Sequence, residues 1–345
     1  MNYISCSLRE FIKNTRNKKV LCFGAGSYFQ VMCCDFSRSY PEINLSGVID
    51  NNEDKHGRTV GTAGFAAEVY SPENALEKFD FSETVVLITT AQLRAVKEQL
   101  GDIDCFSNAE VYSYYDLKRN SICQVDDVHK GGGEPKIPPK LHYCWFGRKE
   151  IPEGLKKCIN SWKRLCPDYD IKRWDESNYD VAKTPFLKEA YEKKCYALVS
   201  DYTRLDIIYN EGGIYFDTDV EIIRNIDFLR LNNGIVATEV IGGINTGSGL
   251  GAARHHPILK EFKKIYEHNR SFAEFSTTTN IGRETGFFYG MGYEPNGKKQ
   301  TVGDMTICPH YILSHKAYET GESLMTGTSV SVHLMDGSWR DNEEL

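Results

Sequence analysis

With 345 residues, the chain is long enough for two domains that each have a hydrophobic core. Its net charge of −7 argues against a nucleic-acid-binding protein, and no apolar run approaches the length of a membrane span. The 11 cysteines include no Cys-x-x-Cys pair, and the N-terminus has no signal-peptide pattern, so we expect a cytoplasmic protein with free thiols.

The first domain is expected over residues 1–120, where strands alternate with helices. The predicted elements are, in chain order, a strand at Lys19–Phe23, a helix over 27–39, a strand at Leu45–Ile49, a strand at Thr84–Thr89 and a helix over 91–100. This alternation predicts an α/β fold with a Rossmann-like, parallel and doubly wound sheet.

The turn Gly24-Ala25-Gly26, together with Asp50, resembles part of a dinucleotide-binding fingerprint. Two glycines permit a tight turn near a pyrophosphate, and an acid after the second strand can reach a ribose hydroxyl. Phe29 occupies the third glycine position, which weighs against nicotinamide binding. A structural or sugar-nucleotide-sensing module is the favoured interpretation, and a nicotinamide-dependent sugar oxidoreductase is an alternative.

Residues 121–135 lose apolar periodicity and contain three consecutive glycines, which predicts a linker. The second domain is expected over residues 136–345. Its predicted elements are a strand at Leu141–Phe146, a helix at Glu153–Leu165, a strand at Asp170–Trp174, a helix at Lys183–Lys194 and a strand at Gly234–Val240.

Trp145 lies near the end of the first of these strands. Its ring either packs in the core or offers a flat face on which a base can stack. The loop Asn245–Gly249 is polar and rich in glycine. It either lines a binding cleft or is a mobile surface loop.

The stretch Ser200–Ile223, SDYTRLDIIYNEGGIYFDTDVEII, predicts a helix, a double-glycine stop and a short strand, followed by Asp217 and Asp219. Ligands of open α/β sheets bind at the carboxyl ends of strands, so this Asp-x-Asp can direct oxygen atoms at a cation. The alternative is an acidic surface turn. Asp201 and Arg204 share a helix face, either as a surface ion pair or as a grip for a polar ligand.

Three motifs occur in a characteristic order: HYCWFG at His142–Gly147, the Asp-x-Asp stretch at Ser200–Ile222, and HLMDGSW at His333–Trp339. Together they resemble glycosyltransferase family 32, the capsular polysaccharide synthesis type with a sugar-binding Asp-x-Asp region. The resemblance covers the second domain only. Related sequences often have Thr-Gly-Pro on the acceptor side, whereas here Phe287 follows Thr285-Gly286.

The resemblance implies a GT-A-like fold, a divalent cation (Mn²⁺ or Mg²⁺) and a nucleotide-sugar donor, with a UDP-sugar favoured. It implies a retaining, metal-dependent transfer to a glycan or lipid-linked glycan acceptor in surface polysaccharide synthesis, at the inner face of a membrane with peripheral contact. A non-catalytic sugar-nucleotide-binding regulatory protein is the alternative function.

The resemblance also assigns roles to individual side chains. Asp217, Asp219 and Arg204 are the expected catalytic residues, and Asp217, Asp219 and His333 the expected metal ligands. The expected donor-binding residues are Trp145 on the base, Asp201 and Arg204 on sugar and ribose hydroxyls, Tyr215 along the ribose, and Ser338 and Trp339 over the diphosphate.

Overall fold

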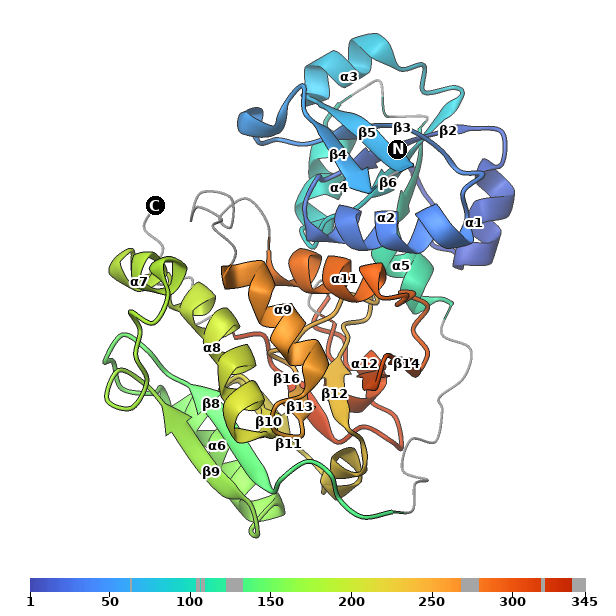
Figure 1. Ribbon diagram of the computed structural model, residues 1–345. Coiled ribbons are helices and arrows are strands. Elements are labelled where there is room, and N and C mark those ends of the chain that lie inside the picture. The colour runs from blue at the N-terminus through green and yellow to red at the C-terminus, as the bar shows by residue number, and fades with distance from the viewer. Residues whose placement is uncertain are drawn as a thin grey trace.

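The computed structural model describes residues 1–62, 64–103, 106, 109–121, 133–267, 279–317 and 320–336. These residues form two seven-stranded sheets and one two-stranded sheet, each flanked by helices (Figure 1). The first large sheet belongs to residues 1–121, called here the N-terminal part, and the other two sheets to residues 133–336, the C-terminal part.

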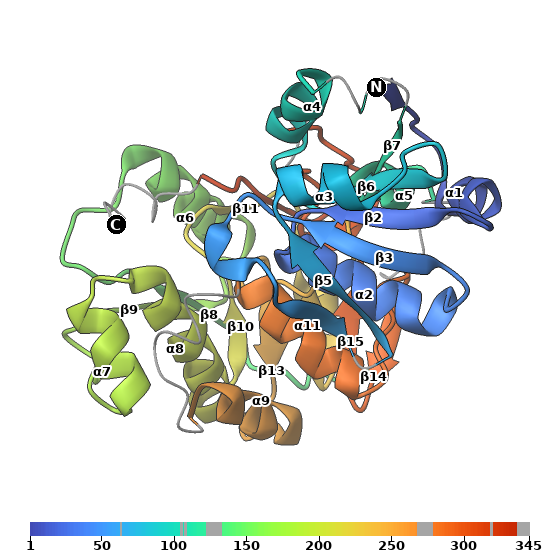
Figure 2. The same cartoon turned by 90° about the horizontal axis from the view of Figure 1, so that it is seen from above.

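The sheet of the N-terminal part has the strand order β1-β7-β6-β2-β3-β5-β4, and only the β4–β5 pair is antiparallel. Its strands are β1 (Asn2–Tyr3), β2 (Lys19–Phe23), β3 (Asn44–Ile49), β4 (Thr59–Thr62), β5 (Phe65–Tyr70), β6 (Thr84–Ile88) and β7 (Glu110–Ser113). Its helices are α1 (Leu8–Thr15), α2 (Ser27–Ser39), α3 (Pro72–Lys78), α4 (Leu93–Gly101) and α5 (Tyr114–Arg119). The predicted parallel α/β arrangement is confirmed, and Figure 2 shows the twist of this sheet from above.

Asp50 contacts the glycine turn after β2 through the backbone of that turn. One carboxylate oxygen of Asp50 accepts a hydrogen bond from the Ala25 backbone N–H at 2.7 Å and pairs with Lys55 at 3.0 Å. Gly24 has φ +107°, and a Cβ atom there would lie 2.9 Å from the Thr89 carbonyl oxygen. The acid therefore stabilises a tight turn, which weakens the nicotinamide alternative.

The large sheet of the C-terminal part is mixed, with the order β14-β15-β12-β13-β10-β8-β9. Strands β13 and β14 run against their neighbours, and β9, β8 and β10 are mutually parallel, as are β12 and β15. The strands are β8 (Lys140–Cys144), β9 (Asp170–Trp174), β10 (Gly213–Tyr215), β12 (Gly234–Ala237), β13 (Leu250–Ala252), β14 (Gln300–Val302) and β15 (Met305–Cys308). The small sheet pairs β11 (Val220–Ile222) with β16 (Ser331–His333).

The helices of the C-terminal part are α6 (Glu153–Leu165), α7 (Pro185–Glu192), α8 (Tyr196–Glu211), α9 (Pro257–Glu267), α11 (Asn280–Gly290) and α12 (His310–Leu313). The predicted bounds of α6 and β9 are confirmed. The predicted strand over 234–240 is wrong at its end, because β12 stops at Ala237. The chain then folds back, and the N–H of Gly242 donates to the Glu239 carbonyl at 2.9 Å.

Helix α8 is buried on almost every side. Three of its charged side chains, those of Asp201, Arg204 and Asp206, are among the buried residues. Asp206 is compensated by Lys183 and Lys263, each at 2.5 Å. A helix of this kind holds its charges in fixed positions, because each has a partner in the interior.

His142, on β8, is a buried histidine whose neighbours fix one neutral tautomer. Its Nε2 lies 2.9 Å from the Gly212 carbonyl, and its Nδ1 accepts a hydrogen bond from the Trp174 indole N–H at 3.1 Å. Protonation of Nδ1 would set two N–H groups against each other. Burial lowers the pKa of His142 to about 4.

We expect His142 to make the protein less stable as the pH falls from 7 to 4. In the unfolded chain the imidazole takes up a proton below a pKa of about 6.5, whereas the folded state keeps it neutral, so the proton favours unfolding. The free energy of unfolding should fall by at most about 1.4 kcal/mol per pH unit because of this histidine. Urea unfolding at pH 7, 6 and 5 measures it, and His142→Gln should reduce the slope. Equal slopes in the two proteins would contradict this assignment.

The two parts of the chain pack directly on each other. Helix α2 lies across α11, with Gly282 so close to Gln30 that a Cβ atom would collide with its side-chain oxygen (Figure 1). Val240 and Ile241 of the C-terminal part belong to the hydrophobic core of the N-terminal part. The predicted boundaries at 120 and 136 stay predictions, because residues 122–132 of the expected linker lie outside the described residues.

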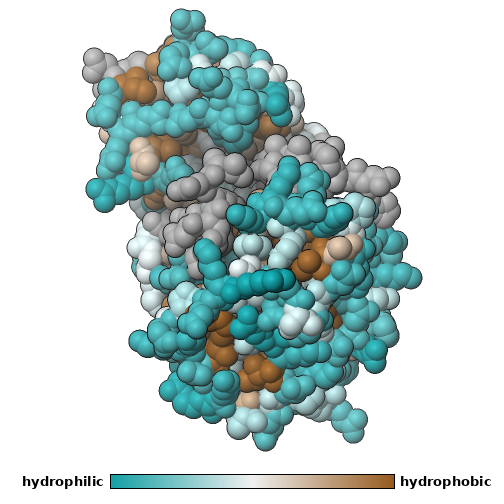
Figure 3. All heavy atoms as spheres, turned by 90° about the vertical axis from the view of Figure 1, so that its left-hand side faces the viewer, coloured by the Kyte–Doolittle hydropathy of each residue, from teal (hydrophilic) through white to brown (hydrophobic). Residues whose placement is uncertain are grey.

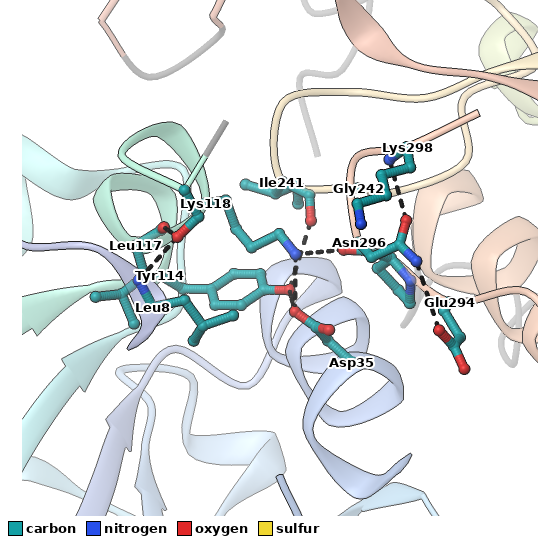
Figure 4. A network of polar contacts seen from close by, with 12 residues as sticks. Leu8, Asp35, Tyr114, Leu117, Lys118, Ile241, Gly242, Glu294, Asn296 and Lys298 are labelled. Atoms are coloured by element: carbon teal, nitrogen blue, oxygen red, sulfur yellow. Dashed lines mark hydrogen bonds and ion pairs between the residues drawn. The ribbon is translucent and has the colours of Figure 1, made fainter. Parts of the chain in front are cut away.

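A buried ion pair lies at this junction (Figure 4). Lys118 pairs with Asp35 at 2.8 Å and also donates to the Pro295 carbonyl of the C-terminal part. The Tyr114 hydroxyl donates to the same Asp35 carboxylate at 3.0 Å. Side chains of both parts therefore satisfy one buried carboxylate, which couples the packing of the parts.

In the described part of the chain, no helix has both the length and the apolar character needed to cross a membrane. The face shown in Figure 3 is mostly hydrophilic, and its hydrophobic residues form separate patches. Among the described residues drawn on that face, the hydrophobic ones form no continuous apolar area.

Candidate functional site

A cavity of about 820 Å³ lies beside the ends of β8 and β10 and contains the Asp-x-Asp pair. Asp217, Asp219 and His333 line it, together with Trp145 and Arg204. The structure thus brings together five of the predicted site residues from three separate motifs. The alternative of an idle acidic surface turn does not fit this position.

Asp217 follows β10 and is held from several directions. Its Oδ1 accepts a hydrogen bond from the Tyr215 hydroxyl at 2.8 Å and lies 3.3 Å from Arg204 Nη2. Its backbone N–H donates to the Gly247 carbonyl at 2.9 Å. A Cβ atom on Gly247 would collide with the second oxygen of Asp217, so a larger residue here would have to displace that carboxylate.

Asp219 lies against His333, because the antiparallel pairing of β11 and β16 sets Val220 opposite that histidine. His333 Nε2 is 3.1 Å from Asp219 Oδ1, and the Asp336 backbone N–H donates to Asp219 Oδ2 at 3.0 Å. Burial opposes charge on both groups, but their attraction is stronger. It lowers the pKa of Asp219 to about 2 and raises the pKa of His333 to about 9.

The three side chains fit a divalent cation. One ligand atom from each of Asp217, Asp219 and His333 lies within 4.8 Å of the other two. Two carboxylates and an imidazole are a donor set for a hard or borderline cation, with room for further ligands in the cavity. Because His333 donates to Asp219 when protonated, a cation bound by the imidazole has to displace that proton.

Arg204 and Asp201 form a buried ion pair at 2.9 Å, so the alternative of a surface pair is wrong. Arg204 reaches the cavity wall, where Nη1 also donates to the Thr246 hydroxyl at 3.2 Å. Asp201 and Tyr215 lie behind Arg204 and Asp217 and are not among the residues that line the cavity. Their observed contacts orient the lining residues. Their direct contacts with a donor stay predictions.

Trp145 lies on the loop after β8, which ends two residues before the predicted end of the strand at Phe146. Its indole N–H donates to the Lys149 carbonyl at 2.7 Å, which fixes the plane of the ring. The ring packs partly against the core and also lines the cavity, and stacking of a base on it stays a prediction.

Ser338 and Trp339, the predicted lid, lie outside the described residues. The preceding residues Met335 and Asp336 line the cavity. The predicted lid role therefore stays a prediction.

The sequence left open whether the loop Asn245–Gly249 lines a binding cleft, and it gave no role to Glu239 or to residues of the N-terminal part. Asn245 and Ser248 belong to the glycine-rich loop, which is buried and not a mobile surface loop. Ser248 contacts His333 Nδ1 at 2.7 Å, and Asn245 lines the cavity. Glu239 lines it as well, although it follows a strand without any motif. Further lining residues come from the N-terminal part: Ser27, Tyr28 and Ala91.

Comparison with known proteins gives a match in the middle of this site. Residues 152–239 match the family model described as the glycosyltransferase sugar-binding region containing DXD motif. The matched range includes Asp201, Arg204, Asp217 and Asp219. It confirms the resemblance to the Asp-x-Asp glycosyltransferases that the motifs predicted for this region.

Two similar curated proteins come from Schizosaccharomyces pombe. Inositol phosphoceramide mannosyltransferase 3 is 32% identical over 153 residues, which is 41% of this chain and 41% of that protein. Inositol phosphoceramide mannosyltransferase 2 is 26% identical over 151 residues, or 42% and 43% of the two chains. The chain therefore spans less than half the length of these relatives.

Among solved structures, a similar one is a glycosyltransferase involved in the glycosylation of the major capsid of PBCV-1. It is 17% identical, the alignment covers 60% of this chain and 98% of that chain, and the TM-score is 0.36.

Proposed function

We propose that this protein is a metal-dependent, retaining glycosyltransferase with a GT-A-like C-terminal part, acting on a nucleotide-sugar donor. The observation that carries the proposal is the joint position of Asp217, Asp219 and His333 in one cavity with Trp145. The cavity overlaps the family match over residues 152–239. A glycan or lipid-linked glycan is the proposed acceptor, in surface polysaccharide synthesis at the cytoplasmic face of a membrane.

In this proposal the residues have separate tasks. Asp217, Asp219 and His333 would hold Mn²⁺ or Mg²⁺, which neutralises the negative charge that develops on the leaving diphosphate. Arg204, itself buried, adds a fixed positive charge beside Asp217. Trp145 offers its ring to the nucleotide base, and Tyr215 holds the carboxylate of Asp217 in place.

The donor is proposed to be a UDP-sugar, with a GDP-activated mannose as the second candidate. The two yeast relatives are named as mannosyltransferases of inositol phosphoceramide, which supports including a mannosyl donor and a lipid-linked acceptor. In the N-terminal part, Asp50 is used within the glycine turn, so we propose a Rossmann-like module that serves the fold and not a nicotinamide site.

Chelation of divalent cations is expected to lower sugar transfer about a hundredfold or more, because the carboxylates alone would repel the diphosphate. The assay measures nucleotide release from UDP-glucose, UDP-galactose, UDP-N-acetylglucosamine and GDP-mannose with EDTA, and again after Mn²⁺ or Mg²⁺ is added back. Recovery with the cation supports the proposal. Donor turnover at the same rate with and without EDTA would contradict the proposed metal dependence.

The same donor panel separates an enzyme from the alternative of a regulatory protein. An enzyme releases nucleotide from at least one donor, and a regulatory protein binds one of them without turnover. Binding without release of nucleotide, in the presence of Mn²⁺ and a saccharide acceptor, would contradict the enzymatic proposal.

A further inference from the structure

Glu239 is a cavity residue to which neither the motifs nor the comparisons assign a role. It lies on the turn after β12, lines the cavity and is 8% exposed. Its Oε1 accepts a hydrogen bond from the Asn245 amide at 2.8 Å. Among the described residues, its Oε2 has no hydrogen-bond or ion-pair partner. A nine-tenths buried carboxylate therefore keeps one oxygen open toward the cavity.

Asn245 holds this carboxylate in one orientation. The side-chain oxygen of Asn245 accepts hydrogen bonds from the N–H groups of Gly247 at 2.9 Å and Ser248 at 3.2 Å. The amide nitrogen must therefore point away from this loop, toward Glu239. Since Ser248 in turn contacts His333, a chain of contacts links Glu239 to the predicted metal ligands.

The turn that carries Glu239 is fixed by both parts of the protein. Its N–H donates to the Gly243 carbonyl at 2.8 Å, and the next residues, Val240 and Ile241, are buried in the core of the N-terminal part. The Tyr293 hydroxyl donates to the Gly242 carbonyl at 2.7 Å. Figure 4 shows Ile241 and Gly242 beside the Lys118 ion pair. Such a rigid turn can present a side chain to a ligand without losing entropy on binding.

The open oxygen of Glu239 indicates what kind of group it binds. A buried carboxylate needs hydrogen-bond donors, which water supplies in the free cavity and a bound ligand can supply in its place. Phosphate oxygens are anionic and would be repelled, whereas neutral sugar hydroxyls donate hydrogen bonds to a carboxylate. In the proposed function the diphosphate is held at Asp217 and Asp219, and the sugar is the neutral part of the donor whose hydroxyl groups can supply these hydrogen bonds.

We propose that Glu239 binds a hydroxyl group of the sugar being transferred and so contributes to the choice of donor sugar. This inference rests on the proposed function of the same cavity. It predicts that Glu239 contributes to binding of the sugar and not to binding of the nucleotide.

The experiment compares Glu239→Ala and Glu239→Gln with the wild type. Isothermal titration calorimetry with Mn²⁺ measures the affinity for UDP and GDP, and for UDP-glucose, UDP-galactose, UDP-N-acetylglucosamine and GDP-mannose. Loss of a charge-assisted hydrogen bond should weaken the preferred nucleotide-sugar about tenfold or more in Glu239→Ala. The affinity for free nucleotide should change by less than about twofold. Glu239→Gln keeps the size of the side chain and a neutral acceptor, so its loss of affinity for the nucleotide-sugar should be smaller.

Glu42→Gln is the matched control, because Glu42 is exposed in the N-terminal part and does not line the cavity. It should leave the affinity for the sugar unchanged. Thermal unfolding shows whether each variant is folded. If Glu239→Ala does not fold, the comparison of nucleotide-sugar with free nucleotide in the isosteric Glu239→Gln decides the question.

Two results would contradict the proposal in different ways. If Glu239 variants lose as much affinity for free nucleotide as for nucleotide-sugar, or lose none for either, the role of Glu239 is overturned and the proposed function stands. If the wild type binds no nucleotide and no nucleotide-sugar of the panel, both are overturned.

Discussion

Replacing Asp219 with asparagine is expected to lower the rate of sugar transfer about a hundredfold or more. The substitution keeps the size of the side chain but removes the charge that pairs with His333 and that would hold a cation. The neutral amide would also leave the His333 imidazolium without its anionic partner. Initial rates of nucleotide release at saturating Mn²⁺ measure the effect, and circular dichroism shows whether the fold is kept.

Asp336→Asn is the control for this substitution. Asp336 lines the same cavity, but it contacts Asp219 through its backbone N–H, which the variant retains. We expect a change of less than about threefold, which corresponds to the small energy of an exposed charge. An Asp219→Asn protein that transfers sugar as fast as the wild type would disprove the catalytic role of the Asp-x-Asp pair.

Replacing Lys118 with methionine is expected to destabilise the protein by about 3–5 kcal/mol, because it leaves the buried Asp35 carboxylate unpaired. The side chains of Lys118 and Asp35 are only 6% and 3% exposed. Urea unfolding followed by tryptophan fluorescence is a sharp measurement, since Trp145, Trp162, Trp174 and Trp339 all lie beyond the predicted linker, in the second domain. If the two parts unfold together, a change on α5 must shift the signal of the C-terminal part.

Lys188→Met is the matched control, because Lys188 on α7 pairs with Glu192 at the surface, with 61% and 63% exposed side chains. It should change stability by less than about 1 kcal/mol. The double variant Lys118→Met with Asp35→Leu should recover much of the loss, as apolar groups replace both charges. A tryptophan transition that is unchanged in Lys118→Met would show that the two parts unfold independently.

The sequence predicted those elements best that have a strong local pattern and clear ends. Strand β2 and helix α2 have the predicted bounds because Gly24 and Gly26 separate a largely apolar run from a helical pattern. Strands of three residues, such as β13 and β16, carry too little pattern to be found. The pairing of β16 with β11, which brings His333 to Asp219, depends on contacts between distant segments.

The sequence predicted the site residues that belong to a recognisable motif and missed those that do not. Asp217 and Asp219 stand out because two acids follow a β-favouring run. The burial of Asp201 and Arg204 could not be predicted, because an acid and a base three residues apart give the same sequence pattern on an exposed and on a buried helix. Glu239 has no local signal at all, and only the fold-back of the chain after Ala237 places it in the cavity.

The packing of α2 on α11 has a consequence for the evolution and engineering of this protein. Because Ser27, Tyr28 and Ala91 line the cavity while Val240 and Ile241 fill the opposite core, neither part can be exchanged as a separate module. Residues 136–345 expressed alone would leave that apolar contact area bare and prone to aggregation. Under the proposed function, substitutions in the first hundred residues, far in sequence from the acidic motif, can therefore change the preference for a donor.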